Sequence, residues 1–226
     1  MIKLIFTSKE VYANKFTPRD VRNAFGSHAK EGRVKELIMW HKNETPKVVY
    51  GKPFSKKFCI YVLNDDMEVI QELMHIAKKD GFTVNGNKIE NIYQEIVSFK
   101  FQKLNQMIEY KTRTPIVYAR NEHTLKVVDA IIGRNKDNKE SLKKELKPLV
   151  IDELKKSIVD SVFATNGQKI STNDIDIDFD DFEAFPIAYK DKRLPAVKPN
   201  TIRVNGITPN FIGYKIGLGY GEIFIN

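Results

Sequence analysis

The first hundred residues alternate between segments with the two-residue period of a strand and segments with the 3.6-residue period of a helix, which constrains the fold more than any other feature. One helix is predicted to begin at Pro18, with Thr17 as its N-cap, and a second to begin after Asp65 or Asp66 and stop at Gly81. The predicted strands are residues 1–8, 34–42, 48–50, 57–63 and a segment between 89 and 102. The order β-α-β-β-α-β predicts a ferredoxin-like domain, with an antiparallel sheet and two helices on one face.

The second half has a looser version of the same pattern. Helices are expected over residues 122–132 and 140–163, and Pro148 should break the latter into two pieces. Short strands are expected at residues 116–119, 174–189 and 201–205, with a tail strand at the C-terminus. We therefore predict an α+β protein of two tandem ferredoxin-like domains, residues 1–110 and 111–226, that ends in a glycine-rich loop.

Positive charge is concentrated at the start of the chain. Residues 1–60 hold 13 Lys and Arg against 5 Asp and Glu, whereas residues 61–226 hold 24 of each sign, so the net charge of +8 lies in the first quarter. A basic block on an otherwise neutral protein is typical of a polyanion-binding surface. A lysine-rich surface that only aids solubility is the alternative.

Several other classes of protein are excluded or not expected. The single cysteine, Cys59, excludes an internal disulfide and a multi-cysteine zinc site. No apolar run approaches the ~20 residues that span a bilayer, and we expect a cytoplasmic protein. The alternation of acidic and apolar residues over 174–180 predicts a strand with one wet face, and no metal is expected there.

Four of the twelve glycines lie within nine residues near the end of the chain: Gly213, Gly217, Gly219 and Gly221. Successive backbone N–H groups in a glycine-rich turn can form a concavity that binds an anion. Because Lys215 lies inside this segment, the loop suits a phosphate group.

With these features assembled, the chain resembles the CRISPR repeat-processing endoribonucleases of the RAMP superfamily. Gly213, Gly219 and Gly221 fall at the last three glycines of the G-x-G-x5-G-x-G loop of that family, and Phe211 stands where the first glycine would be. Segments similar to the family occur in order along the chain, at residues 39–42 with 51–53, 114–117 with 120–122, and 208–213.

The resemblance implies an enzyme that cleaves precursor CRISPR RNA within the repeat, without a metal or other cofactor. The 2′-hydroxyl attacks the phosphorus and leaves a 2′,3′-cyclic phosphate. It implies a catalytic histidine in or just after the first helix, which points to His28 at the end of that helix, and His41 is the reserve candidate. For stabilising charge we expect Lys52, with Lys42 as its alternative, and Tyr50 as a hydrogen-bonding group. A histidine in a last helical turn also interacts with the helix dipole, so a structural role for His28 stays open.

RNA is expected to contact basic side chains near the first helix and the glycine-rich loop. The predicted RNA-binding residues are Arg19, Arg22, Lys30, Arg33, Lys35, Gly213, Lys215, Gly217, Gly219 and Gly221. Tyr214 and Tyr220 could stack on bases or pack beneath the loop, and packing is favoured for Tyr220.

The implied partner is CRISPR repeat RNA, with other CRISPR effector proteins and a monomeric or homodimeric state left open. Two alternatives to the nuclease stay open. The first is a non-catalytic RNA-binding RAMP subunit of a CRISPR ribonucleoprotein. The second is a ferredoxin-like domain that binds a small nucleotide through the loop, against which the uneven charge argues.

Overall fold

A computed structural model of the chain describes residues 1–8, 17–40, 46–53, 55–97, 100–119, 121–189, 192–209, 211–214, 216 and 221–225. Internal contacts divide the chain into two compact units. The first unit is Met1–Phe99 with Ala164–Gly167 and Ile216–Gly219, and the second is Lys100–Phe163 with Gln168–Lys215 and Tyr220–Asn226.

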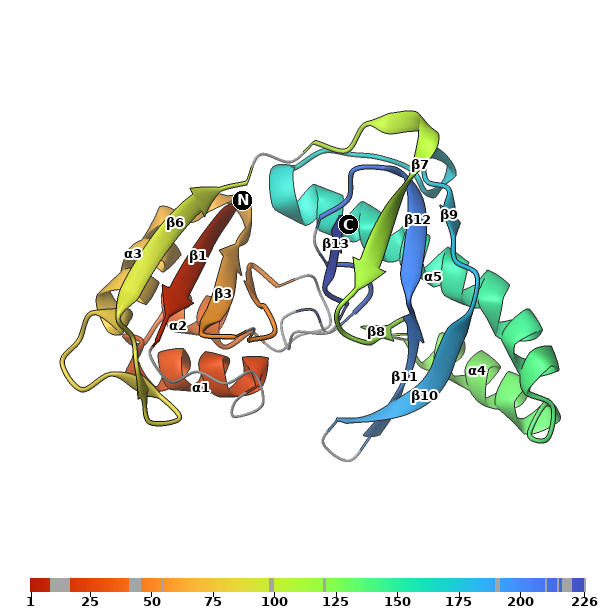
Figure 1. Cartoon of the computed structure of the whole chain (residues 1–226), viewed down its shortest axis with the longest axis horizontal. Coiled ribbons are helices and arrows are strands. Elements are labelled where there is room, and N and C mark those ends of the chain that lie inside the picture. The colour runs from red at the N-terminus through yellow and green to blue at the C-terminus, as the bar shows by residue number, and fades with distance from the viewer. Residues whose placement is uncertain are drawn as a thin grey trace. The chain divides into compact units, whose positions relative to one another are not determined.

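The first unit is built on a four-stranded antiparallel sheet of order β2-β3-β1-β6. Its strands are β1 (Ile2–Thr7), β2 (Val48–Tyr50), β3 (Lys57–Val62) and β6 (Asn91–Ile96), and its helices are α1 (Pro18–His28), α2 (Arg33–Ile38) and α3 (Met67–Ala77). A short 3-10 helix, η1 (Leu63–Asp65), and a hairpin of β4 (Thr83–Val84) and β5 (Asn87–Lys88) complete it. Figure 1 shows β6, β1 and β3 side by side in this sheet.

The core of the first unit lies on one face of the sheet. Leu4 and Phe6 of β1 are fully buried there, together with Phe25 of α1 and Leu73 of α3. Because side chains alternate across a strand, this register leaves Lys3 and Ile5 on the opposite face. The β-α-β-β-α-β order predicted from the sequence is therefore confirmed, with β2 as the second strand.

Both predicted helix starts are confirmed by their caps. Thr17 Oγ1 accepts the N–H of Asp20 at 3.3 Å, and Asp20 Oδ2 accepts the N–H of Thr17 at 2.7 Å, which is a complete capping box. Asp66 caps α3 by accepting the N–H of Val69 at 3.3 Å. The reciprocal pair fixes the first turn of α1, and the single side-chain bond of Asp66 caps the first turn of α3.

The strand predicted over residues 34–42 was wrong, because residues 33–38 form the helix α2. Val34, Leu37 and Ile38 pack against the same core. Their spacing of three and four residues is that of a helix. In a segment this short, the apolar residues match the two-residue period of a strand nearly as well, so the sequence alone did not distinguish the two. Burial against α1 and α3 decides in favour of the helix.

The second unit holds two antiparallel sheets, of order β13-β7-β12-β9 and β10-β11-β8. Its strands are β7 (Lys103–Thr112), β8 (Ile116–Val117), β9 (Ile177–Asp178), β10 (Phe182–Tyr189), β11 (Lys192–Pro199), β12 (Thr201–Gly206) and β13 (Ile223–Ile225). Its helices are α4 (Glu122–Arg134), α5 (Lys139–Asn166) up to Phe163, and the 3-10 helix η2 (Thr172–Asp174). Figure 1 shows β7 beside β12. The expected α+β class with antiparallel sheets is confirmed. Strand β7 runs across the predicted boundary between residues 110 and 111, and the division into two domains at that boundary stays a prediction.

The predicted break at Pro148 was wrong, because α5 runs unbroken from Lys139 to Asn166 with Pro148 inside it. Leu146 and Val150 flank the proline and are buried, whereas Pro148 itself is exposed. The buried turns on both sides of Pro148 stabilise the helix through their packing. Because Pro148 has no backbone N–H, the carbonyl four residues earlier lacks its helical partner, and water can hydrogen-bond that carbonyl on the exposed side. None of the described helices, α5 included, is both long and apolar enough to cross a lipid bilayer.

The acidic stretch over residues 174–180 forms part of a 3-10 helix and then the short strand β9, and its side chains are ion-paired. Arg203 of β12 donates to Asp178 at 2.6 Å and to Asp180 at 2.5 Å. The Arg203 guanidinium, with Lys147, holds the pKa of Asp178 below its ordinary value. These carboxylates therefore stabilise the pairing of β9 with β12.

Replacing Pro148 with Ala should stabilise the protein. The substitution restores a backbone N–H within α5 at an exposed position, and we expect the free energy of unfolding to rise by about 1–3 kcal/mol. Urea unfolding followed by circular dichroism measures it. An unchanged or lower stability would contradict this account of α5.

Candidate functional site

His28 is the last residue of α1, and its imidazole is exposed and oriented by the helix backbone. Its Nδ1 lies 2.9 Å from the carbonyl oxygen of Ala24, one turn earlier. Ser27 Oγ lies 3.1 Å from the same nitrogen, so two groups of α1 hold Nδ1. None of the described residues is hydrogen-bonded to Nε2. The contacts at Nδ1 thus orient the ring and leave Nε2 as the nitrogen that is available to a ligand.

The His28 ring also contacts Phe82, which lies just before the β4–β5 hairpin. The two rings meet edge to face, with centroids 5.2 Å apart, and Phe82 is buried. Lys79 approaches from the end of α3, with Nζ 3.4 Å from the backbone carbonyl oxygen of His28. A cation therefore lies next to the histidine.

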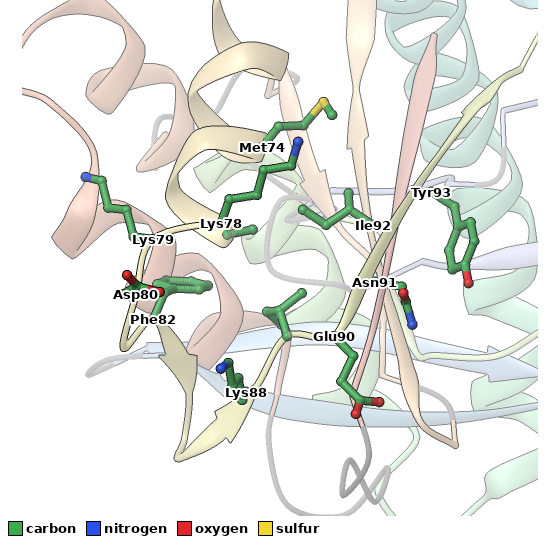
Figure 2. A pocket seen from close by; sticks show the side chains of 12 residues that line it. Met74, Lys78, Lys79, Asp80, Phe82, Lys88, Glu90, Asn91, Ile92 and Tyr93 are labelled. Carbon is green, nitrogen blue, oxygen red and sulfur yellow. The ribbon is translucent and has the colours of Figure 1, made fainter.

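Phe82 also forms part of a pocket of about 350 Å³ between the end of α3, the β4–β5 hairpin and the start of β6. Figure 2 shows its lining: Lys78 and Lys88 lie at opposite ends of the pocket, Phe82 lies toward one side, and Ile92 and Tyr93 of β6 lie toward the other. Three lysines and two carboxylates, Lys78, Lys79, Lys88, Asp80 and Glu90, line this pocket. Apolar surface with lysines around it suits part of a polyanionic chain.

Tyr50, predicted as a hydrogen-bonding group of the site, is 1% exposed and donates its hydroxyl hydrogen to the carbonyl of Ile38 at 3.0 Å. Burial raises its pKa above the ordinary value, an effect that the charge of Arg22 partly offsets. Lys52, two residues later, is exposed. His41 and Lys42, the reserve candidates, lie outside the described residues.

The structure thus places the predicted residues in two groups. His28 lies with Lys79 and Phe82, whereas Tyr50 lies with Arg22 and Ile38. Among the described contacts, none joins the two groups.

The predicted phosphate-binding cations differ in how available they are. Arg19 and Lys30 are exposed. Arg33 donates to Asp66 and to Glu68, both at 2.6 Å, and the hydrogen bond with Asp66 is the main cause of its raised pKa. Lys35 forms an ion pair with Glu31 at 2.5 Å. Arg33 and Lys35 would have to release these carboxylates to hold a phosphate at full strength.

Gly213 and Gly221 shape the glycine-rich segment through close backbone contacts. The N–H of Gly213 donates to Ser157 Oγ at 2.8 Å, and that of Gly221 donates to the carbonyl of Pro115 at 2.8 Å. Both glycines have positive φ, and a Cβ on Gly221 would lie 1.8 Å from the carbonyl oxygen of Ile212. Their amides are therefore used within the protein. Lys215, Gly217, Gly219 and Tyr220 lie outside the described residues, and an RNA contact there stays a prediction.

Tyr214 packs in the core of the second unit. It is 8% exposed, its hydroxyl donates to Glu153 Oε2 at 3.3 Å, and its N–H donates to the carbonyl of Val117 at 2.7 Å. Of the two roles considered from the sequence, the structure places Tyr214 in the packed one.

The lysines around the pocket were missed by sequence reasoning. Lys78 and Lys79 form a basic pair directly after α3, and Lys88 follows on the next hairpin. These lysines lie within residues 61–226, where basic and acidic residues are equal in number. The net charge of that segment therefore gives no sign of them. The basic pair at a helix end was the signal that could have indicated them.

Taken together, the exposed site offers a histidine whose ring is held at Nδ1, a neighbouring cation, and a pocket lined by three lysines and two carboxylates. Such groups suit a reaction in which a hydroxyl loses a proton beside a phosphate ester.

Comparison with known proteins shows which fold the chain has. No protein-family model matches the sequence, and no curated protein matches it. Among solved structures, one of Cas6b has a TM-score of 0.74 at 14% identity, covering 100% of this chain and 99% of that one. A CRISPR RNA processing endoribonuclease Cas6b gives 0.61 at 12%, covering all of both chains, and an RAMP protein binding different RNA substrates gives 0.59 at 13%, also covering both fully. The chain therefore has the tandem ferredoxin-like fold of these proteins, as the sequence resemblance predicted.

Replacing Gly221 with Ala should destabilise the second unit. A Cβ there meets the Ile212 carbonyl and the backbone has φ of 73°, so we expect a loss of about 3 kcal/mol in the free energy of unfolding. The matched control is Gly86→Ala, at φ of 78° with nothing within 4 Å of the added carbon. Urea unfolding of both variants measures the difference. Equal losses would show that the close approach contributes nothing.

Proposed function

We propose that this protein is a CRISPR-associated endoribonuclease that cleaves precursor CRISPR RNA within the repeat by acid–base catalysis, without a metal. The observation that carries the proposal is the state of His28, exposed beside Lys79 with Nδ1 engaged by the Ala24 carbonyl. The likeness in fold to Cas6b over the full length of both chains supports it.

The proposed reaction is an attack by the RNA on its own backbone. Nε2 of His28 accepts the proton of the 2′-hydroxyl, and the 2′-oxygen forms a bond to phosphorus. The bond from phosphorus to the 5′-oxygen breaks, and that oxygen receives a proton from an acid. The products are a 2′,3′-cyclic phosphate and a free 5′-hydroxyl, so atoms and charge balance without a cofactor.

Positive charge would stabilise the pentacovalent transition state. We assign this role to Lys52, or to its alternative Lys42, and to Lys79 beside His28. Tyr50 is a buried phenol that the Ile38 carbonyl and burial keep neutral. In this proposal Tyr50 therefore supports the packing beneath the site.

RNA binding would extend from His28 over the neighbouring basic surface. Lys78 and Lys88 line the pocket next to it, and Arg19 and Lys30 are exposed on or just after α1. Phosphate contacts of this kind position the RNA and carry no sequence information. We keep a cytoplasmic location as part of the proposal.

Replacing His28 with Ala should abolish cleavage while RNA is still bound. Loss of a general base lowers a rate by ~10²-fold or more. The measurement is single-turnover cleavage of a labelled CRISPR repeat RNA in EDTA, with filter binding of the same RNA alongside. The matched control is His75→Ala, which removes an exposed imidazole from α3 in the same unit.

Full activity of the His28→Ala variant would contradict the assignment of His28 and direct attention to His41. Tight RNA binding by the unmodified protein with no product under any condition would instead establish the alternative, a non-catalytic RNA-binding RAMP subunit.

A further inference from the structure

A second pocket, of about 420 Å³, lies within the second unit between α4, the start of α5 and the β10–β11 hairpin (Figure 1). None of its lining residues is among the catalytic or RNA-binding residues predicted from the sequence. A concave pocket of this size is typical of a site for a small molecule or for one part of a larger ligand. Apolar side chains form most of its wall: Leu125, Val128, Ile132, Leu142, Leu146 and Pro195.

The pocket stays open because one face of the hairpin carries small side chains. Pro186 of β10 is paired with Pro195 of β11, and Ala188 is paired with Arg193. Alternate residues of a strand share a face, so Ala184 lies on the same face as these four. The larger apolar side chains of α4 and α5 therefore meet a wall of alanine and proline, and space remains between the two layers.

Tyr118 brings a buried polar group to this pocket. It directly follows β8, its backbone N–H donates to the carbonyl of Pro195 at 3.4 Å, and its side chain is 1% exposed. No described residue forms a hydrogen bond with its hydroxyl, although a buried tyrosine hydroxyl normally has a partner. Burial raises the pKa of this hydroxyl, and the charge of Asp129 raises it further. Because Asp129 also lines the pocket, the hydroxyl lies at the pocket side of the ring.

Two charged side chains of opposite sign complete the lining. Asp129 of α4 and Arg193 of β11 are exposed, and neither forms a hydrogen bond or an ion pair within the described part of the chain. Arg134, further along α4, is by contrast bound to Glu145 of α5 at 2.9 Å. The pocket therefore combines apolar walls with one hydroxyl, one carboxylate and one guanidinium that are available to a ligand.

Guanine matches this combination of groups better than the other bases of RNA. A nucleobase has two apolar faces, which the walls of the pocket can cover, and a polar edge. Guanine carries N1–H and an N2 amino group side by side, and both can donate to a carboxylate such as that of Asp129. Its O6 and N7 are acceptors, which suit the guanidinium of Arg193 and the hydroxyl of Tyr118. Adenine has neither N1–H nor O6 and matches fewer of these groups.

We propose that this pocket binds one unpaired guanine base of the RNA, with Asp129 at its Watson–Crick edge and with Arg193 and Tyr118 at O6 and N7. The inference rests on the proposed function for the source of the base, whereas the pocket and its polar groups are features of the protein alone. Phosphate contacts position RNA without reading its sequence. The pocket would therefore let the protein distinguish one base of the repeat.

The test measures binding of the full chain to two labelled oligoribonucleotides, UUUUGUUUU and UUUUAUUUU, by fluorescence anisotropy in EDTA. The unmodified protein should bind the RNA with guanine about tenfold more tightly, the scale of one bidentate contact to a base. Asp129→Asn should remove most of this preference and leave the affinity for the RNA with adenine unchanged. The matched control is Asp137→Asn, which makes the same change of charge at an exposed residue after α4 and should keep the full preference.

Unlabelled guanosine is the third probe, because a free nucleoside offers the same base as the RNA. It should compete with the RNA that contains guanine only at concentrations far above those of the unlabelled RNA itself, since it makes no phosphate contacts.

Tyr118→Phe examines the hydroxyl without any ligand. This variant should have an unchanged or raised melting temperature, because it removes a buried group that has no partner, and its preference for guanine should fall. The matched control is Tyr110→Phe in the same unit. The Tyr110 hydroxyl donates to the carbonyl of Gly206 at 3.1 Å and accepts the N–H of Thr208 at 3.0 Å, so the melting temperature of that variant should fall by several degrees.

Four outcomes would overturn the proposal. Equal affinity of the unmodified protein for the two RNAs would show that it does not read this base, and a preference that Asp129→Asn keeps in full would place the reading elsewhere. Guanosine that competes as well as the RNA would show a site for a small molecule. A melting temperature that falls as far for Tyr118→Phe as for Tyr110→Phe would show that a protein group already binds the hydroxyl. None of these outcomes measures cleavage, so this proposal and the nuclease proposal can fail separately.

Discussion

The packing of four aromatic rings fixes α1 on the first sheet, and the proposed chemistry depends on it. Phe6 stacks on Phe58 with centroids 4.9 Å apart, and Phe25 of α1 meets Phe6 at 5.4 Å and Phe82 at 4.9 Å. Phe82 in turn contacts the ring of His28 at 5.2 Å. The core and the candidate catalytic residue are therefore in direct contact, and a helix packed in this way can present His28 in a fixed position.

Local signals in the sequence predicted the elements that depend on local contacts. The capping box of Thr17 and the cap at Asp66 set the starts of α1 and α3. Strand β7 was not predicted, because it is stabilised by pairing with β12 and β13, which lie about a hundred residues further along the chain. The break predicted at Pro148 also failed because of tertiary packing. The low helix propensity of one proline was outweighed by the burial of its neighbours in α5.

The candidate site was predictable in part. His28 could be placed at a helix end from the sequence, and the resemblance to RNA-processing enzymes gave it a role. Its neighbours Lys79 and Phe82 lie more than fifty residues further on and meet it only through the packing of the fold. Whether a cation is paired is equally invisible in a sequence: Arg33 proved to be bound by two carboxylates, whereas Arg19 is exposed.

The most direct test of the account is to incubate the unmodified protein with an end-labelled CRISPR repeat RNA in EDTA and to map both ends at the break. The account predicts a single cut within the repeat that leaves a 2′,3′-cyclic phosphate on one fragment and a 5′-hydroxyl on the other. RNA that stays intact in EDTA, or fragments that carry a 5′-phosphate, would contradict it.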